Sequence, residues 1–210
     1  MAGARERFPG YDVVSQSGHW DPVTAGVVLA RLAPPPALRF FDPREEAVGT
    51  ALVDLLLAQH RVDGPAGRRY VPVFAMIDSR LAEGDTDGWH YADMPEDGDA
   101  WRASLAHLDH DANARYGRGF AECSPPEQEA LVRAVNDLGA GTWHDLPAKQ
   151  VWSLWTRYAC TAYYAHPWSW DEIGFGGPAY PRGYKNRGVG RREPYEVPDH
   201  HPDVDPVRGS

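Results

Sequence analysis

The sequence predicts an all-α protein, a compact bundle of about five helices with an irregular segment at each end. Apolar residues recur at helical spacing through the central part of the chain, and helix-capping signatures precede several of these runs. No strand–helix–strand pattern and no internal repeat occurs. We therefore expect three regions: an irregular extension over residues 1–39, a helical body over residues 40–167 and an extended tail over residues 168–210.

The N-terminal extension contains turn signals and one segment that fits two structures. Asp21 followed by Pro22 is typical of the start of a short helix, because Asp caps helices and Pro suits the first helical position. Residues 24–32 suit a strand equally well. Residues 34–36 are three prolines, which form a stiff, extended spacer.

A capping box and two apolar stripes predict the first two helices of the body. Asp42 is the N-cap, Pro43 fits the first helical position and Glu45 completes the box. This helix is expected to reach about His60, with the stripe Val48, Ala51, Leu52 and Leu55. A polar loop precedes a second helix over residues 72–83, with the stripe Phe74, Ile77 and Leu81, and an acidic loop follows it over residues 84–98.

The third predicted helix, over residues 99–121, has the longest apolar face. Its stripe consists of Trp101, Leu105, Leu108, Ala112, Tyr116 and Phe120. Ser124 and Glu127 form a second capping signature and open a fourth helix. The fifth helix opens at Pro147, ends before Pro167 and is apolar on most sides, which is typical of a helix that is covered on more than one side.

The tail combines large aromatic residues with Gly and Pro at a density that neither helix nor strand tolerates. Such a segment is expected to form no core of its own and to lie against the helices or against another protein. Tyr and Trp are frequent anchors at protein interfaces. The predicted partner-binding residues are Trp168, Trp170, Phe175, Tyr180 and Tyr184.

Composition and charge argue against several classes of protein. A net charge of −9 does not suit nucleic-acid binding, which needs a basic face, and no apolar run is long enough for a transmembrane helix. The N-terminus lacks the apolar segment of a signal peptide, so a cytoplasmic location is expected. Cys123 and Cys160 lack metal-type spacing and are expected to be two buried thiols.

No fingerprint of a catalytic or nucleotide site occurs. The Gly-rich run from Gly174 follows no predicted strand and opens no helix, so it is expected to form turns between aromatic residues. His107, His110 and Asp111 share one helix face, for which a solvated polar face is the simpler interpretation. A metal-dependent enzyme that uses these three, with His19 as a further ligand, is one alternative function. A free-standing module that stacks the tail aromatics on a sugar is another.

Five stretches of the sequence carry a resemblance to a known family. They are residues 39–46, residues 73–81, residues 105–116 with Gly119 and Phe120, residues 152–158 and, most specifically, residues 166–184. On these stretches the chain resembles the gluconate 2-dehydrogenase subunit 3 family over roughly residues 38–190.

The resemblance implies an accessory subunit that carries no flavin and no catalytic residue. It implies a heterodimer with a large FAD-containing subunit of the glucose-methanol-choline oxidoreductase type, which oxidises sugars or polyols. The small subunit is expected to stabilise that partner in a chaperone-like way, and no catalytic, cofactor-binding or metal-binding residue is carried over. Some members of the family carry a twin-arginine signal. The start of this sequence shows no such motif, so three expectations stay open: the complex stays cytoplasmic, the partner carries the export signal, or the start given is a truncated one.

Overall fold

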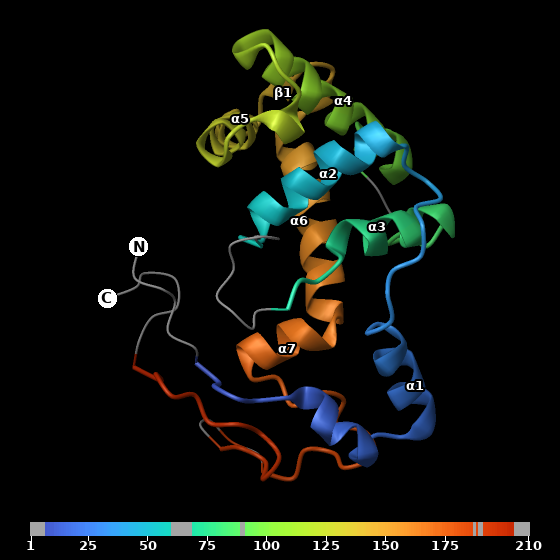
Figure 1. Cartoon of the computed structure of the whole chain (residues 1–210), viewed down its shortest axis with the longest axis vertical. Helices are drawn as coiled ribbons and strands as arrows, with labels where there is room; N and C mark the ends of the chain where they lie inside the picture. The colour runs from blue at the N-terminus through green and yellow to red at the C-terminus, as the bar shows by residue number, and fades with distance from the viewer. Residues whose placement is uncertain (1–6, 60–68, 89–90, 187, 189–190, 204–210) are drawn as a thin grey trace. The chain divides into compact units, whose positions relative to one another are not determined.

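The computed structural model describes residues 7–59, 69–88, 91–186, 188 and 191–203. The chain divides into two units by its internal contacts (Figure 1). Unit 1 comprises Met1–Pro34 and Tyr164–Ser210, and unit 2 comprises Pro35–Tyr163. The described residues are mostly helical, and the sheet found among them is one short antiparallel pair, β1 (Thr142–Trp143) with β2 (Leu146–Pro147). The all-α prediction is therefore confirmed.

Unit 2 contains the five helices that the sequence predicts for the body. These are α2 (Pro43–Leu56), α3 (Val73–Ala82), α4 (Asp97–Tyr116), α5 (Pro125–Asp137) and α6 (Ala148–Ala165). The last two residues of α6 fall in unit 1. Helix α2 packs against α3, α4 and α5. These three helices cover the face of α2 that its apolar stripe predicts to be buried.

The predicted capping box of α2 is present, since the Asp42 carboxylate accepts from Arg44 and Glu45 while Glu45 accepts from the Asp42 N–H. Helix α2 ends at Leu56, earlier than predicted, and the predicted end at His60 lies outside the described residues. Gly49 sits inside this helix because a Cβ there would lie 2.0 Å from the ring of Phe74. The close approach of α2 and α3 therefore depends on a glycine.

The predicted helix over residues 99–121 is wrong at its C-terminal end. Helix α4 ends at Tyr116, where Gly117 takes the left-handed conformation with φ 70° that commonly ends helices. A short 3-10 helix, η2 (Phe120–Glu122), follows. The Asp109 carboxylate accepts the N–H of Phe120 at 2.8 Å. This contact turns the chain back towards α4, so Phe120 is buried at the start of η2 and not as part of a longer α4.

The core of unit 2 is rich in aromatic rings. Phe41 stacks on Phe74 with ring centroids 4.7 Å apart, and Trp101 contacts both rings edge-on. Trp155 of α6 is fully buried and its indole donates to the Ser104 hydroxyl of α4 at 2.9 Å. Helix α6 is thus a core helix, as its mostly apolar sequence predicts.

Unit 1 is more regular than the sequence predicts. The N-terminal segment forms a 3-10 helix, η1 (Val13–His19), and a helix, α1 (Pro22–Ala30), so the helix interpretation of the Asp21–Pro22 signal is correct. The expectation that the tail has no helix is wrong for its first residues, which form α7 (Pro167–Ile173). His166 caps α7, Pro167 opens it and Gly174 ends it, so the local signals were present in the sequence.

Unit 1 also has a small core, which the tail forms together with the N-terminal segment rather than on its own. Trp170 of α7 packs with Val13, Trp20 and Val28 from the N-terminal segment. Gly177 has φ 76°, and a Cβ there would lie 2.6 Å from the Trp20 ring. Gly174 lies similarly close to the ring of Phe8. The glycines of the tail therefore admit aromatic rings from the other end of the chain as well as forming turns.

We expect Gly177→Ala to disrupt the folding of unit 1. The substitution combines an unfavourable positive φ with a clash against Trp20, and such backbone strain alone costs on the order of 1–3 kcal/mol. Hydrogen exchange measured by mass spectrometry checks this, with faster exchange expected in η1, α1 and α7. Gly183→Ala is the matched control, because Gly183 also lies in unit 1 and has positive φ but has nothing within 4 Å of its Cβ position. Equal effects of the two variants on unit 1 would contradict the packing argument.

Candidate partner-binding surface

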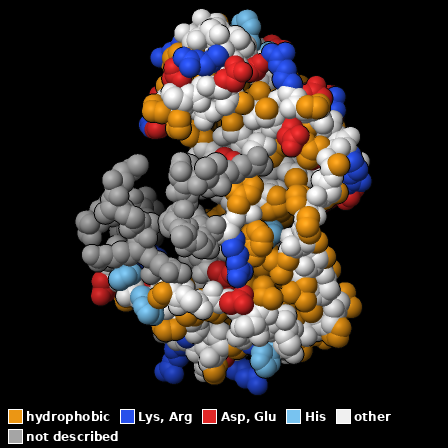
Figure 2. Space-filling view, in the orientation of Figure 1, with side chains coloured by type: hydrophobic (Ala, Val, Ile, Leu, Met, Phe, Trp, Pro, Cys, Tyr) orange, Lys and Arg blue, Asp and Glu red, His pale blue; other side chains and the backbone are white. Residues whose placement is uncertain are grey.

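Large hydrophobic side chains are exposed mainly in unit 1. Ten are exposed among the described residues, and eight of them belong to this smaller unit. They are Val23, Val27, Leu29, Tyr164, Ile173, Phe175, Tyr180 and Tyr184. Figure 2 shows such side chains on the surface around α1. Concentrated exposed apolar surface of this kind is typical of a protein–protein interaction site.

The five sequence-predicted partner-binding residues differ in how accessible they are. Tyr180, Tyr184 and Phe175 are 69%, 52% and 40% exposed. Trp168 is half-buried, and its ring lies 4.6 Å from that of His166. Trp170 is buried, at 6% exposure, and its indole donates to the Tyr164 carbonyl at 2.6 Å. Trp170 therefore belongs to the core of unit 1, and the accessible aromatic rings are those that follow α7.

A buried histidine fixes the start of this region. The Nε2–H of His166 donates to the Arg31 carbonyl at 2.8 Å, and its Nδ1 accepts the Trp168 N–H at 3.2 Å. This pattern requires the neutral ring, with the proton on Nε2. Burial agrees with it, because desolvation lowers the pKa of His166. Arg31 donates in turn to the Ala165 carbonyl at 2.6 Å. Two hydrogen bonds therefore link Arg31, which follows α1, to the two residues that precede α7.

The rest of the tail is ordered by polar contacts within unit 1. Arg7 pairs with Asp199, which holds the pKa of that carboxyl below its usual range, and the His200 N–H donates to the Arg7 carbonyl at 2.9 Å. The buried Glu193 carboxylate accepts the N–H groups of Lys185 and Asn186. These contacts hold the exposed rings of Tyr180 and Tyr184 on a structured segment.

The exposure of the apolar residues Val23 and Val27 of α1 was not predicted from the sequence. The sequence feature that could have indicated their exposure is the run from Pro22 to Ala30, which contains no charged residue. Whether such a run lies in the core or on the surface depends on how many neighbours cover it, and composition does not supply that information.

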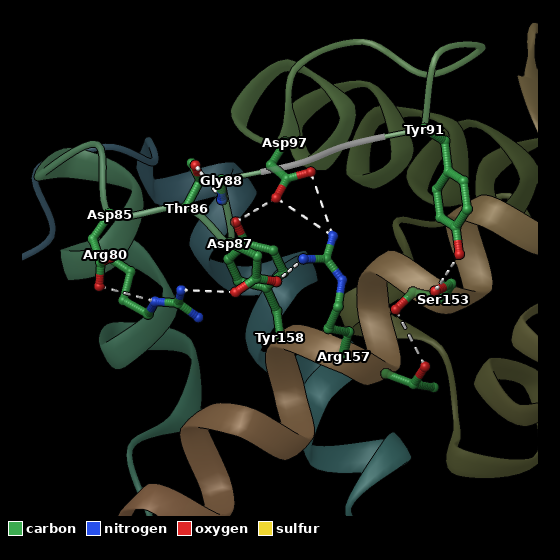
Figure 3. Close-up of polar contacts among 11 residues, drawn as sticks. Arg80, Asp85, Thr86, Asp87, Gly88, Tyr91, Asp97, Ser153, Arg157 and Tyr158 are labelled. Carbon is green, nitrogen blue, oxygen red and sulfur yellow. Dashed lines mark hydrogen bonds and ion pairs between the residues drawn. The ribbon is translucent and has the colours of Figure 1, made fainter.

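A second polar cluster lies in unit 2, where the acidic loop meets α3 and α6 (Figure 3). Arg157 lies between two carboxylates, pairing with Asp87 through Nη1 and with Asp97 through Nη2 at 3.4 Å. Arg80 reaches Asp87 from the other side at 3.2 Å, and the Tyr158 hydroxyl donates to Asp97 at 2.6 Å. The carboxylates of Asp87 and Asp97 are engaged by residues of the chain itself, so the cluster serves to fix the loop.

Electrostatic effects within this cluster agree with a structural role. Burial, followed by the hydrogen bond to Asp97, raises the pKa of the Tyr158 hydroxyl, which stays protonated and remains a donor. Burial also lowers the pKa of Arg157. The sequence signals were the acidic loop and Arg157 within the family-like stretch 152–158, but their pairing was not predicted.

The structure does not bring His107, His110 and Asp111 together as metal ligands. The Nε2–H of His107 donates to Asp145 at 2.8 Å, which holds the pKa of Asp145 below its usual range. Asp111 accepts from the Trp143 indole and from His144, each at 2.8 Å. His110 is exposed, and His19 belongs to the other unit. Over the residues that the structure describes, no group of three or more His, Cys, Asp or Glu is placed to hold a metal ion.

The two cysteines are free, and only Cys123 is buried, so the prediction of two buried thiols is wrong for Cys160, which is exposed on α6. Burial raises the pKa of the Cys123 thiol. Within the described ranges, no helix has both the length and the apolar character that crossing a membrane requires.

Comparison with known proteins identifies a family. A family model described as gluconate 2-dehydrogenase subunit 3 matches residues 43–177, which is more than half of the chain. The matched range begins at α2 and ends within the Gly-rich run that follows α7. Searches of curated proteins and of solved structures gave no significant match.

Proposed function

Because this chain belongs to the gluconate 2-dehydrogenase subunit 3 family, we propose that it is the non-catalytic small subunit of a flavin-dependent dehydrogenase. In this proposal it binds and stabilises a large FAD-containing subunit of the glucose-methanol-choline oxidoreductase type, which oxidises a sugar or polyol. The family is one of dehydrogenase subunits, which implies a multi-subunit complex. Catalytic residues and FAD are assigned to the partner.

The observation that carries this proposal is the concentration of exposed hydrophobic residues in unit 1. Phe175, Tyr180 and Tyr184 are held on a tail whose backbone is fixed by Glu193 and by the Arg7–Asp199 pair. A preorganised aromatic surface loses little conformational entropy on binding, which favours a stable complex. Interfaces of permanent complexes bury on the order of 2,000 Å² or more and are rich in such residues.

The assignment of FAD to the partner is supported by the glycine-rich run of this chain. Phe8 and Trp20 pack directly against Gly174 and Gly177, and Gly174 ends α7, whereas a phosphate-binding loop leads into the N-terminus of a helix. The strand β2, which consists of Leu146 and Pro147, leads directly into α6 at Ala148, and no glycine lies at this junction. Neither segment resembles a dinucleotide fingerprint.

The proposal predicts that the tagged chain, purified from its native host, carries a larger, yellow, flavin-absorbing subunit. Tyr180→Ala with Tyr184→Ala is expected to weaken this complex, because deep aromatic anchors typically contribute about 2–4 kcal/mol each. The affinity is measured by titrating the separated subunits. Leu138→Ala is the matched control, since Leu138 is 44% exposed on unit 2.

Two results would contradict the proposal. One is purification of the chain alone, with flavin and enzyme activity absent from every co-eluting fraction. The other is calorimetric binding of simple sugars by the isolated chain that Tyr180→Ala and Tyr184→Ala abolish, which would indicate a free-standing sugar-binding module instead.

A further inference from the structure

Helix α1 differs from every other α-helix of the described chain in having no charged side chain. Its nine residues are Pro22–Ala30, with the sequence PVTAGVVLA. The flanking charges are engaged at its ends. The Asp21 carboxylate accepts the N–H groups of Val23 and Thr24, and Arg31 donates to the Ala165 carbonyl. The helix therefore presents an uncharged surface on a protein with a net charge of −9.

One side of α1 is packed and the opposite side is open. Val28 is buried in the core of unit 1, with Ala25 packed beside it. Val23 is 77% exposed and Val27 is 55% exposed. These two residues are four positions apart, so they share one helix face, which Ala30 continues. Exposed aliphatic side chains on a face without charges favour burial against another apolar surface.

The open face also has room for close approach. A Cβ at Gly26 would have nothing within 4 Å among its neighbours. Gly26 adjoins Val27 and lies three residues after Val23, so the face has a shallow notch between two aliphatic side chains. Large side chains of a partner fit such a notch, and small residues at a helix surface allow two elements to pack closely.

We propose that this face of α1 is a docking surface for an uncharged, apolar area of the large dehydrogenase subunit. The proposal rests on the proposed function and extends it to a part of the chain outside the matched residues 43–177. Because α1 and the exposed tail rings belong to the same unit, one partner is expected to contact both.

Charge and length argue against two other occupants. A second copy of the chain would bring together two molecules of net charge −9, which is unfavourable. A membrane surface attracts helices that carry Lys or Arg on their polar face, and α1 carries neither. At nine residues, α1 is also far shorter than the ~20 residues that span a bilayer.

The test is the double variant Val23→Asp with Val27→Lys. Both residues are exposed, the net charge is unchanged, and the charges suit the ends of the helix dipole and form an i,i+4 pair, so α1 is expected to remain folded. The measurement is the affinity for the large subunit that co-purifies with the wild-type chain, together with the circular dichroism of the variant. We expect at least a tenfold weaker affinity with an unchanged spectrum. Val27→Thr, which keeps the side-chain shape, is expected to give a smaller loss in the same direction.

Leu138→Asp in unit 2 is the control and is expected to change the affinity less than twofold. Unchanged affinity of the α1 variant, with weakened binding by Tyr180→Ala and Tyr184→Ala, would overturn this inference and leave the proposed function standing. If the wild-type chain is a dimer and the α1 variant is a monomer, the face binds a second copy of the chain and the inference is overturned. If the wild-type chain binds anionic phosphatidylglycerol vesicles and the variant does not, the face binds a membrane surface and the inference is likewise overturned. Absence of any large subunit in the purified material would overturn both proposals.

Discussion

Replacement of Asp78 by alanine is expected to destabilise unit 2 by about 3–5 kcal/mol. The Asp78 carboxylate is 1% exposed and accepts three consecutive backbone N–H groups, from Arg39 at 2.8 Å and from Phe40 and Phe41 at 2.9 Å each. Alanine would leave these donors without their acceptor in a buried environment. The measurement is the free energy of unfolding from urea denaturation followed by circular dichroism.

The size of this effect follows from the position of the Asp78 side chain. It joins α3 to the segment that leads into α2, and Phe41 at that junction stacks on Phe74. Loss of the carboxylate is therefore expected to loosen this aromatic contact as well. Asp78→Asn should cost less than Asp78→Ala, because one acceptor oxygen remains while the amide meets a donor. Asp85→Ala is the control, since Asp85 is mostly exposed and its substitution should leave stability nearly unchanged.

An unchanged urea midpoint for Asp78→Ala would show that the three N–H groups find other acceptors, and the argument for this junction would fail. The contact also gives a physical reason for two family-like stretches of the sequence. Residues 39–46 and residues 73–81 meet through Asp78, so a carboxylate at this position fixes how the two helices join.

Replacement of Trp170 by alanine is expected to unfold much of unit 1 while unit 2 stays folded. Trp170 is 6% exposed and packs with Val13, Trp20 and Val28, and truncation of a buried aromatic residue typically costs about 3–5 kcal/mol. The indole hydrogen bond to the Tyr164 carbonyl would be lost as well. Hydrogen exchange is the measurement, with faster exchange expected in η1, α1 and α7 and unchanged exchange in α2, α4 and α5.

Tyr180→Ala is the comparison for this variant, because Tyr180 is 69% exposed and should affect binding without affecting exchange. The two variants separate a role in the core of unit 1 from a role in partner binding, whereas the sequence predicted partner binding for both residues. If Trp170→Ala left the exchange of η1 and α1 unchanged, Trp170 would not be part of their core and its assignment to partner binding would regain support.

Several features of the fold were predictable because their causes are local. The helix starts at Asp42–Glu45 and Ser124–Glu127 depend on side chains that cap N–H groups within three residues, and both capping boxes are present. The apolar period of α4 likewise predicted its buried face, including Trp101, Leu105 and Leu108. The family was recognisable from short stretches of sequence, and the family model matches residues 43–177, which include four of the five stretches in part or in full and the start of residues 166–184.

What only the tertiary structure decided depends on contacts between distant parts of the chain. Composition does not separate the buried Trp170 from the exposed Tyr180, because the difference arises from Val13, Trp20 and Val28, more than one hundred residues away. The same holds for the end of α4, which Asp109 helps to fix by capturing the Phe120 N–H, and for the open face of α1. Local propensity selects a helix, whereas the number of neighbours that cover each face decides which side chains remain for a partner.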